Sequence, residues 1–158
     1  MTKTSKEIQA PPGPPTMAAG GPLSYALVQA AKAHKARAAL LLREIGLYPA
    51  QELVLMHLWD RDDRSQSELV RVLNLDPSTV TRTVARLDEQ GIVRRQASAV
   101  DGRAVIVSLT PRGRELCSEV GRVWGELEAL ATSGLSERQR ADMLRGLRRI
   151  TGALTAHD

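Results

Sequence analysis

The sequence predicts a mainly α-helical protein with one small β-hairpin. Helix start signals recur along the chain. In each of them Ser, Thr or Asp either precedes a proline or stands three residues before a Glu or Gln. Apolar residues recur at helical spacing over most of the chain, and this period changes to that of strands between residues 92 and 109. Because the chain has no phenylalanine, its core must come from Leu, Val, Ile and Ala, which suits helices.

The length of 158 residues is that of one ordinary domain, which can bury a core without disulfides. Residues 1–22 hold five of the eight prolines and predict a disordered N-terminal tail. No apolar run is long enough to cross a membrane, and the N-terminus shows no secretory signal. The single cysteine, Cys117, cannot form an internal disulfide, which fits a reducing cytoplasm.

Two helices are expected before residue 65. The first covers residues 23–45, and Gly46 ends it in a position that favours a left-handed backbone. Pro49 is expected to begin the second helix at its first position. The side chains expected to be buried by this second helix are Leu53, Met56 and either Leu58 or Trp59.

The next two helices have clear start signals. A capping box at residues 65–68 begins a third helix that ends near Leu73. Asp76 as N-cap and Pro77 at the first position begin a fourth helix over residues 77–90.

A hairpin and two more helices complete the chain. Residues 92–96 and 103–109 read as strands joined by a turn at Asp101-Gly102. Thr110 caps a fifth helix that runs to about residue 131, and a capping box at residues 136–139 begins the last. The apolar face of the last helix carries Met143, Leu144, Leu147, Ile150 and Leu154.

The order helix, turn, helix, hairpin within residues 46–111 is that of a winged helix-turn-helix. In this fold the second helix of the pair enters the major groove of DNA, and the hairpin can reach a minor groove. Val80, Val84 and Leu87 are spaced to face the core, which leaves short polar side chains and Arg82 facing outward. Positive charge is concentrated in the same part of the chain, because residues 78–114 carry seven arginines and only three acidic residues.

The stretch of roughly residues 46–116 closely resembles the MarR family of multiple antibiotic resistance regulators. The resemblance implies an obligate homodimer in which residues 23–45 and 112–158 form dimerisation helices around the DNA-binding region 46–111. It also implies a pseudo-palindromic operator, repression as the common mode, and release by a small aromatic or phenolic anion. The matching features are Gly46-Leu47 before a Pro-initiated helix, Gln66 to Leu69, Ser78-Thr79-Val80-Thr81-Arg82, Arg86-Leu87, Gly91-Ile92-Val93, Arg95, Asp101 and Arg103, Leu109-Thr110, and Gly113.

Residues at the helix pair and the wing are the expected DNA contacts. Arg82 is the first candidate for a contact with a base edge, and Arg103 is the first candidate for a DNA contact made by the wing. Arg95 and Asp101 could instead form an ion pair that stiffens the wing, and capping explains Ser65 as well as a phosphate contact does. The full set is Ser65, Gln66, Ser78, Thr79, Thr81, Arg82, Arg86, Arg95, Asp101 and Arg103.

An effector pocket for a small organic anion would need cationic donors within an apolar lining. Arg86 could serve either this pocket or a DNA phosphate. The candidates for the pocket are His34, Arg37, His57 and Arg86.

Other function classes find little support in the residues. Three separated histidines and one cysteine have no metal-ligand spacing, and no catalytic pair stands out, so we expect no metal, no cofactor and no enzyme activity. Cys117 reads as a small buried hydrophobe. The alternatives are a winged-helix protein-interaction module, which the outward arginines disfavour, and a cysteine-based redox regulator.

Overall fold

The computed structural model describes residues 15–99 and 102–156 and confirms a mainly helical chain with a hairpin wing. A short 3-10 helix precedes the first long helix, and the remaining tail residues, 1–14, lie outside the described part. The elements are η1 (Thr16–Ala18), α1 (Pro22–Glu44), α2 (Gln51–Asp60), β1 (Arg64–Ser65), α3 (Gln66–Leu73), α4 (Pro77–Glu89), β2 (Val93–Ala97), β3 (Val105–Leu109), α5 (Pro111–Thr132) and α6 (Glu137–Thr155).

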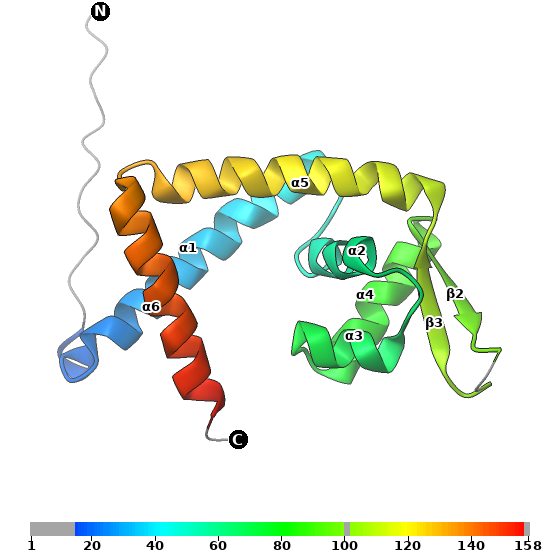
Figure 1. Cartoon of the computed structure of the whole chain (residues 1–158), viewed down its shortest axis with the longest axis horizontal. Coiled ribbons are helices and arrows are strands. Elements are labelled where there is room, and N and C mark those ends of the chain that lie inside the picture. The colour runs from blue at the N-terminus through cyan, green and yellow to red at the C-terminus, as the bar shows by residue number, and fades with distance from the viewer. Residues whose placement is uncertain (1–14, 100–101, 157–158) are drawn as a thin grey trace, which may run out of the picture.

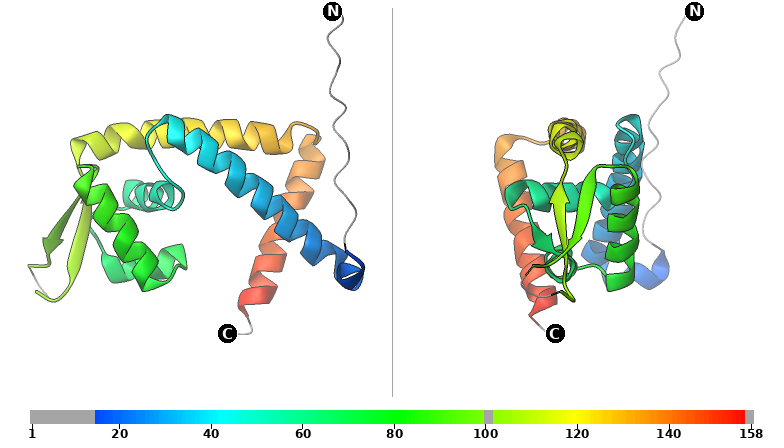
Figure 2. Two further views of the ribbon diagram at one scale, coloured as in Figure 1. Left: turned by 180° about the vertical axis from the view of Figure 1, so that it is seen from behind. Right: turned by 90° about the vertical axis from the view of Figure 1, so that its right-hand side faces the viewer.

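The long helix α5 connects the two parts of the molecule (Figure 1). Helices α2, α3 and α4 and the hairpin lie under its N-terminal half, whereas α6 descends from its C-terminal end. Helix α1 crosses α5 and extends away from the winged part, as the view from behind shows (Figure 2). The chain therefore consists of a compact winged region and two helical arms, α1 and α6, joined by α5.

The hairpin belongs to a three-stranded antiparallel sheet with the order β1-β3-β2. Val93 pairs with Leu109 at the base of the wing, and Ala97 pairs with Val105 toward its tip. Strand β1 was not expected, since two residues are too few to show alternation. Its pairing of Ser65 with Ile106 ties the start of α3 to the wing.

The core of the winged region is built from aliphatic side chains that are shielded from solvent. Val80, Val84 and Leu87 on α4 are fully buried, as their spacing predicts. Gly113 in the first turn of α5 packs so closely on the backbone carbonyl of Ile92 that a Cβ there would collide with it. This close approach anchors α5 to the base of the wing.

Four of the expected helix starts are confirmed by side-chain caps. Ser65 and Ser136 each form a complete capping box with the residue three positions on. Asp76 accepts a hydrogen bond from the backbone N–H of Thr79, and Thr110 accepts one from Gly113. Gly46 has a φ of 76° after α1, as the expected helix end requires.

The start of α2 differs from the expectation. Pro49 stands before the helix, because Ala50 adopts a left-handed backbone and the Tyr48 N–H donates to Gln51 Oε1 at 2.9 Å. The expected buried face is wrong for the same helix, since Leu53 is half-buried and Met56 is exposed. The side chains that the helix buries are Val54, Leu55 and Leu58, so Leu58 rather than Trp59 faces the core, together with Gln51 and Glu52.

The arms present apolar side chains to solvent. Helix α6 has no buried residue, and the expected apolar face of Met143, Leu144, Leu147 and Leu154 is exposed. Leu23, Val28 and Leu40 are exposed on α1. Among the described residues no helix is long and apolar enough to span a bilayer.

Candidate nucleic-acid interface

Helix α4 presents one polar face to solvent and one apolar face to the core. Ser78, Thr81, Arg82 and Arg86 are exposed, while the residues between them at helical spacing are buried. The guanidinium groups of Arg82 and Arg86 form no hydrogen bond or ion pair with any described residue, although the charge of Arg82 acts on Asp76 at the start of the helix. Both guanidinium groups are therefore available to an anion, and the helix can approach one closely because its first turn carries only short side chains.

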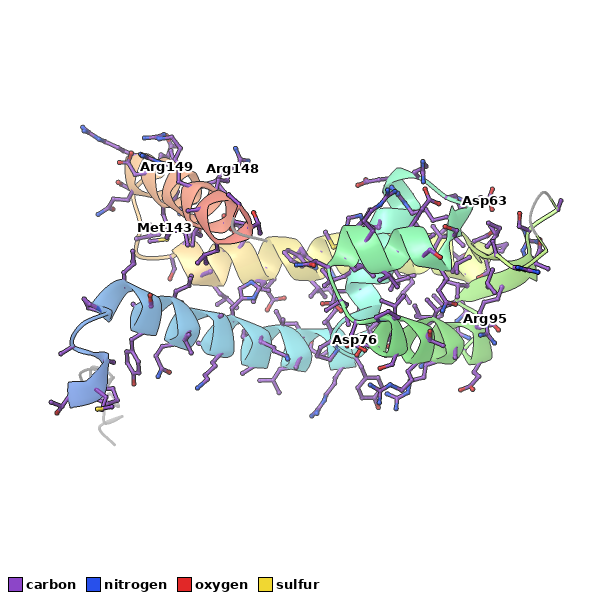
Figure 3. All side chains as sticks on the ribbon, turned by 90° about the horizontal axis from the view of Figure 1, so that it is seen from below. Asp63, Asp76, Arg95, Met143, Arg148 and Arg149 are labelled. Carbon is purple, nitrogen blue, oxygen red and sulfur yellow. The ribbon has the colours of Figure 1, made fainter. Side chains whose placement is uncertain are left out.

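The turn before α4 is fixed by Asp76, which lies at the N-terminal end of α4 (Figure 3). Its carboxylate accepts hydrogen bonds from the Ser78 hydroxyl at 2.6 Å and from the Thr79 backbone N–H at 2.9 Å. These bonds, first the one from Ser78, hold the pKa of Asp76 far below its usual value. Ser78 and Thr79 are thus oriented by Asp76 before any partner arrives.

Helices α3 and α4 are linked on the same surface. Gln66 Nε2 donates to the Thr81 hydroxyl at 2.7 Å, and this hydroxyl donates to the Pro77 carbonyl at 2.8 Å. Ser65 takes part in the capping box with Glu68, so its hydroxyl is occupied within the protein. The structure brings Gln66 and Thr81 together and gives Ser65 a role in helix capping.

The wing is tied to α4 by an ion pair that the sequence did not indicate. Arg95 Nε donates to the Asp88 carboxylate at 3.0 Å, and Figure 3 shows Arg95 beside the C-terminal part of α4. Asp101, the partner considered for Arg95, lies outside the described residues. Arg103 is exposed near the wing tip. Arg94, also exposed on β2, was missed, and its only sequence signal is the alternation of that strand.

A second set of acidic residues positions the wing from the other side. Asp62 accepts hydrogen bonds from the Leu109 N–H at 2.9 Å and from Arg114 at 2.5 Å. Asp63, which has a φ of 54°, accepts a hydrogen bond from the Ser108 hydroxyl. The loop after α2 therefore braces β3 and the start of α5, a role that nothing in the local sequence pattern indicates.

The four expected effector residues lie in different places. His34 packs against Trp124, with 6.1 Å between ring centroids, and Arg37 forms an ion pair with Glu126 at 3.7 Å. His57 is half-buried on α2. Arg86 instead lines a cavity of about 180 Å³ between α4 and the turn before α2, together with Arg82 and with Tyr48.

Cys117 is partly buried against α2, and its thiol lies 3.8 Å from the Leu55 carbonyl oxygen. Burial raises the pKa of this thiol, so the thiolate that reacts with oxidants is disfavoured. Within residues 15–99 and 102–156 no cluster of His, Cys, Asp or Glu could hold a metal ion.

Comparison with known proteins agrees with this geometry. The model of the MarR family matches residues 47–105, which span the helix pair and most of the wing. The organic hydroperoxide resistance transcriptional regulator of Bacillus subtilis (strain 168) is 29% identical over 103 residues, covering 65% of this chain and 67% of that protein. Within residues 47–105 this chain is therefore similar to the MarR family.

Solved structures extend the likeness to the arms. BpsR of Bordetella bronchiseptica, described with the regulation of its DNA binding by 6-hydroxynicotinic acid, is 26% identical with a TM-score of 0.75, covering 81% of this chain and 97% of that one. A mutant MarR from E. coli complexed with operator DNA shares the fold, with a TM-score of 0.79, 24% identity and coverage of 87% and 99%. The chain has the winged helix-turn-helix fold of these structures, and the relatives that it matches are DNA-binding transcriptional regulators.

Proposed function

We propose that this chain is a homodimeric repressor of the MarR type that binds a pseudo-palindromic operator and is released by a small aromatic anion. The proposal rests on the two faces of α4. One face is fully buried, and the other is free to enter a major groove. Arg82 and Arg86 stand on the free face without a described hydrogen bond or ion pair, next to short hydroxyl side chains that Asp76 orients. We infer that the protein acts by binding DNA. We also infer that it does so in the cytoplasm, where its operator would lie.

Base reading is assigned to the first turns of α4. Thr81 and Arg82 face outward there, and a guanidinium can bind guanine O6 and N7 with two hydrogen bonds. Gln66, held by Thr81, keeps α3 in register with α4 on the same surface. Arg94, Arg95 and Arg103 supply the wing with positive charge toward a minor groove or the phosphates.

The exposed apolar faces of α1 and α6 support the homodimer. Adjacent exposed leucines on α6 form an apolar stripe that a second copy of the chain would cover, as in the family. Two winged regions related by a two-fold axis would meet half-sites about one helical turn apart, near 34–36 Å. The proposed operator symmetry follows from that of the dimer.

Selection of bound duplexes from a random pool, followed by fluorescence anisotropy, tests the DNA-binding assignment. Arg82→Ala should weaken binding to the selected operator by about 1–3 kcal/mol and relax the preference at one position per half-site. Arg138→Ala on α6 is the matched control, because Arg138 lies on the arm and forms only a long ion pair with Asp142. An unchanged operator affinity in Arg82→Ala contradicts the placement of α4.

The anion is assigned to the cavity lined by Tyr48, Arg82 and Arg86. Two guanidinium groups and one aromatic ring suit a carboxylate or phenolate on a single ring. An anion bound there would occupy the same arginines that are assigned to DNA, so binding of the two would be mutually exclusive. His34 and Arg37 lie elsewhere, where their partners are Trp124 and Glu126.

A DNA-release titration over a panel of aromatic acids at fixed salt tests the effector. Constant salt matters because added ions alone weaken protein–DNA binding. Release by an acid should weaken at least fivefold in Arg86→Ala, a coupling of about 1 kcal/mol, and should persist in Arg37→Ala. If no acid releases the operator at millimolar concentration, the anion proposal fails while DNA binding stands.

A further inference from the structure

The two helical arms carry more positive charge than the winged region. Residues 22–45 and 136–156, which form α1 and α6 with their capping residues, hold nine lysines and arginines and three acidic residues. The winged region, residues 46–111, holds eight arginines and nine acidic residues. Binding of one duplex by α4 and the wing therefore leaves the basic excess of the arms without an explanation.

On α6 the positive charge gathers on one face. Arg138, Arg145 and Arg149 are seven and four residues apart, so they lie on the same side of the helix. Figure 3 shows Arg148 and Arg149 on the side of α6 that faces away from α1, and Met143 on the side toward α1. The four arginines form a basic face that lies opposite the exposed apolar stripe of the same helix.

One acidic residue balances this basic face only in part. Asp142 lies 4.0 Å from Arg138 Nε and also forms an ion pair with Arg145, so two arginines share its carboxylate. The side chains of these two arginines stay 94% and 67% exposed. Arg148 and Arg149 are exposed and form no hydrogen bond or ion pair with any described residue. Two guanidinium groups are therefore available, and the face keeps a positive charge.

The basic face is separate from the surface of α4. Helix α5 has 22 residues, which is about 33 Å of helix. The wing and α4 lie at its N-terminal end, and α6 begins at its C-terminal end (Figure 1). Arg148 and Arg149 also lie on the opposite side of α5 from Asp76 at the start of α4 (Figure 3). A partner of the basic face is thus a different molecule, or a different segment, from the DNA on α4.

A row of arginines on a straight helix suits the phosphates of a DNA duplex. Each guanidinium can bind a phosphate through two hydrogen bonds. Arg138 and Arg149 are eleven residues apart, about 17 Å along the helix, and one strand of a duplex presents about five phosphates over that length. A protein already bound to an operator also meets further DNA at a high local concentration. These features favour DNA over an acidic polypeptide.

We propose that the basic face of α6 binds the phosphate backbone of a second DNA duplex, so that a protein bound to its operator holds another segment of DNA. In a dimer the positive charges of both copies would repel one another, and bound phosphates would relieve this repulsion. The inference rests on the proposed function in one respect, because the operator must occupy the winged regions.

Energy transfer between two labelled duplexes tests this second contact. The selected operator, with both half-sites and a donor dye, saturates the full-length protein, and a scrambled duplex with an acceptor dye is then titrated in. Transfer should rise with the scrambled duplex and fall steeply with added salt, as phosphate contacts do. A protein that binds its operator without any transfer overturns the inference and leaves the proposed function intact.

Variants of α6 locate the contact. Arg148→Ser/Arg149→Ser should weaken the apparent affinity for the scrambled duplex about tenfold and lower the slope of log affinity against log salt by about two. Arg149→Ser alone should lower this slope by about one, whereas its matched control Arg122→Ser should not, because Arg122 already pairs with Glu119 on α5. All three variants should bind the operator alone as the unmodified protein does. Undiminished transfer in the double variant overturns the assignment.

A second measurement decides the inference even if no operator is found, an outcome that contradicts the proposed function instead. Arg82→Ala/Arg86→Ala protein lacks the arginines of α4 and should still bind the scrambled duplex through α6. Adding the two α6 serine substitutions should abolish this residual binding, and binding that persists overturns the inference.

Two rival occupants of the basic face give different results. Polyglutamate at the same charge concentration should displace the scrambled duplex less than unlabelled duplex does, and equal displacement would assign the face to an acidic polypeptide. If a second copy of the chain covers the face, Arg148→Ser/Arg149→Ser should change the mass in light scattering and leave transfer unchanged. Either result overturns the inference.

Discussion

The winged region and the helical arms differ in how far one copy of the chain covers its own apolar side chains. In the winged region Leu55, Leu69, Val80 and Leu87 are all 0% exposed. On α6, by contrast, Met143, Leu144, Leu147 and Leu154 are 52%, 51%, 42% and 69% exposed. Both segments carry the same kinds of aliphatic residue at the same helical spacing, so the difference comes from their surroundings.

A single copy of the chain therefore buries the apolar side chains of its winged region but leaves those of the arms exposed. Stacked helices, a sheet and the N-terminal half of α5 close the winged core on several sides. Helix α6 meets its neighbours over little of its length, and Arg148 and Arg149 extend from it away from α1 (Figure 3). An apolar stripe of this kind is stabilised when another surface removes it from water.

The largest effect should come from a charge introduced into the exposed apolar stripe of α6. Leu147→Arg should give a monomer at micromolar concentration in light scattering, because a buried unpaired guanidinium would oppose the dimer. Operator affinity should fall about 100-fold or more, since two linked half-site contacts become one. Arg148→Ala, at the neighbouring position, should remain dimeric. A dimer that persists in Leu147→Arg would show that α6 is not at the interface.

A cavity in the winged core should be nearly as costly and should not depend on the partner. Leu87→Ala should lower the free energy of unfolding by about 2–5 kcal/mol in urea titrations, at any protein concentration. Leu154→Ala removes the same atoms from an exposed position of the arm, so its effect should change with protein concentration. The same dependence on concentration for both variants would contradict the division into a complete and an incomplete region.

Two glycines of α5 allow a closely packed position and an open position to be compared on one helix. Gly113→Ala should destabilise the protein by about 1–3 kcal/mol, because the added methyl group collides with the Ile92 carbonyl. Gly121→Ala meets no atom within 4 Å and should stabilise it by up to about 1 kcal/mol through helix propensity. Thermal unfolding followed by circular dichroism separates them, and equal midpoints would argue against the close packing of α5 on the wing.

The smallest expected effect is a pH dependence at the start of α3. The Ser65 backbone N–H, and then Arg61, lower the pKa of Glu68 from 4.5 to about 2. The stabilisation is therefore fully present above pH 4.5 and is lost as the pH falls toward 2. Glu68→Gln should be less stable than the unmodified protein at pH 7, and the gap should close near pH 2. Arg61→Ala should show a weaker effect, because the bond from Ser65 remains.

Local signals were enough to predict much of the fold and part of the site. The caps at Ser65, Asp76, Thr110 and Ser136 are short-range hydrogen bonds between residues three apart, so the sequence determines them. The buried stripe of α4 follows from helical spacing, and with it the outward position of Arg82. The family resemblance rests on the same residues and is confirmed by the family model.

Only the tertiary structure decided contacts between residues far apart in the chain. Strand β1 exists because β3 lies next to it, and Arg95 pairs with Asp88 because the hairpin folds back along α4. Trp59 and Trp124 come together because α2 packs under α5, and this packing also leaves Asp60 beside them without a described partner. Spacing along one helix predicts which side chains share a face, but it carries no information about what that face meets.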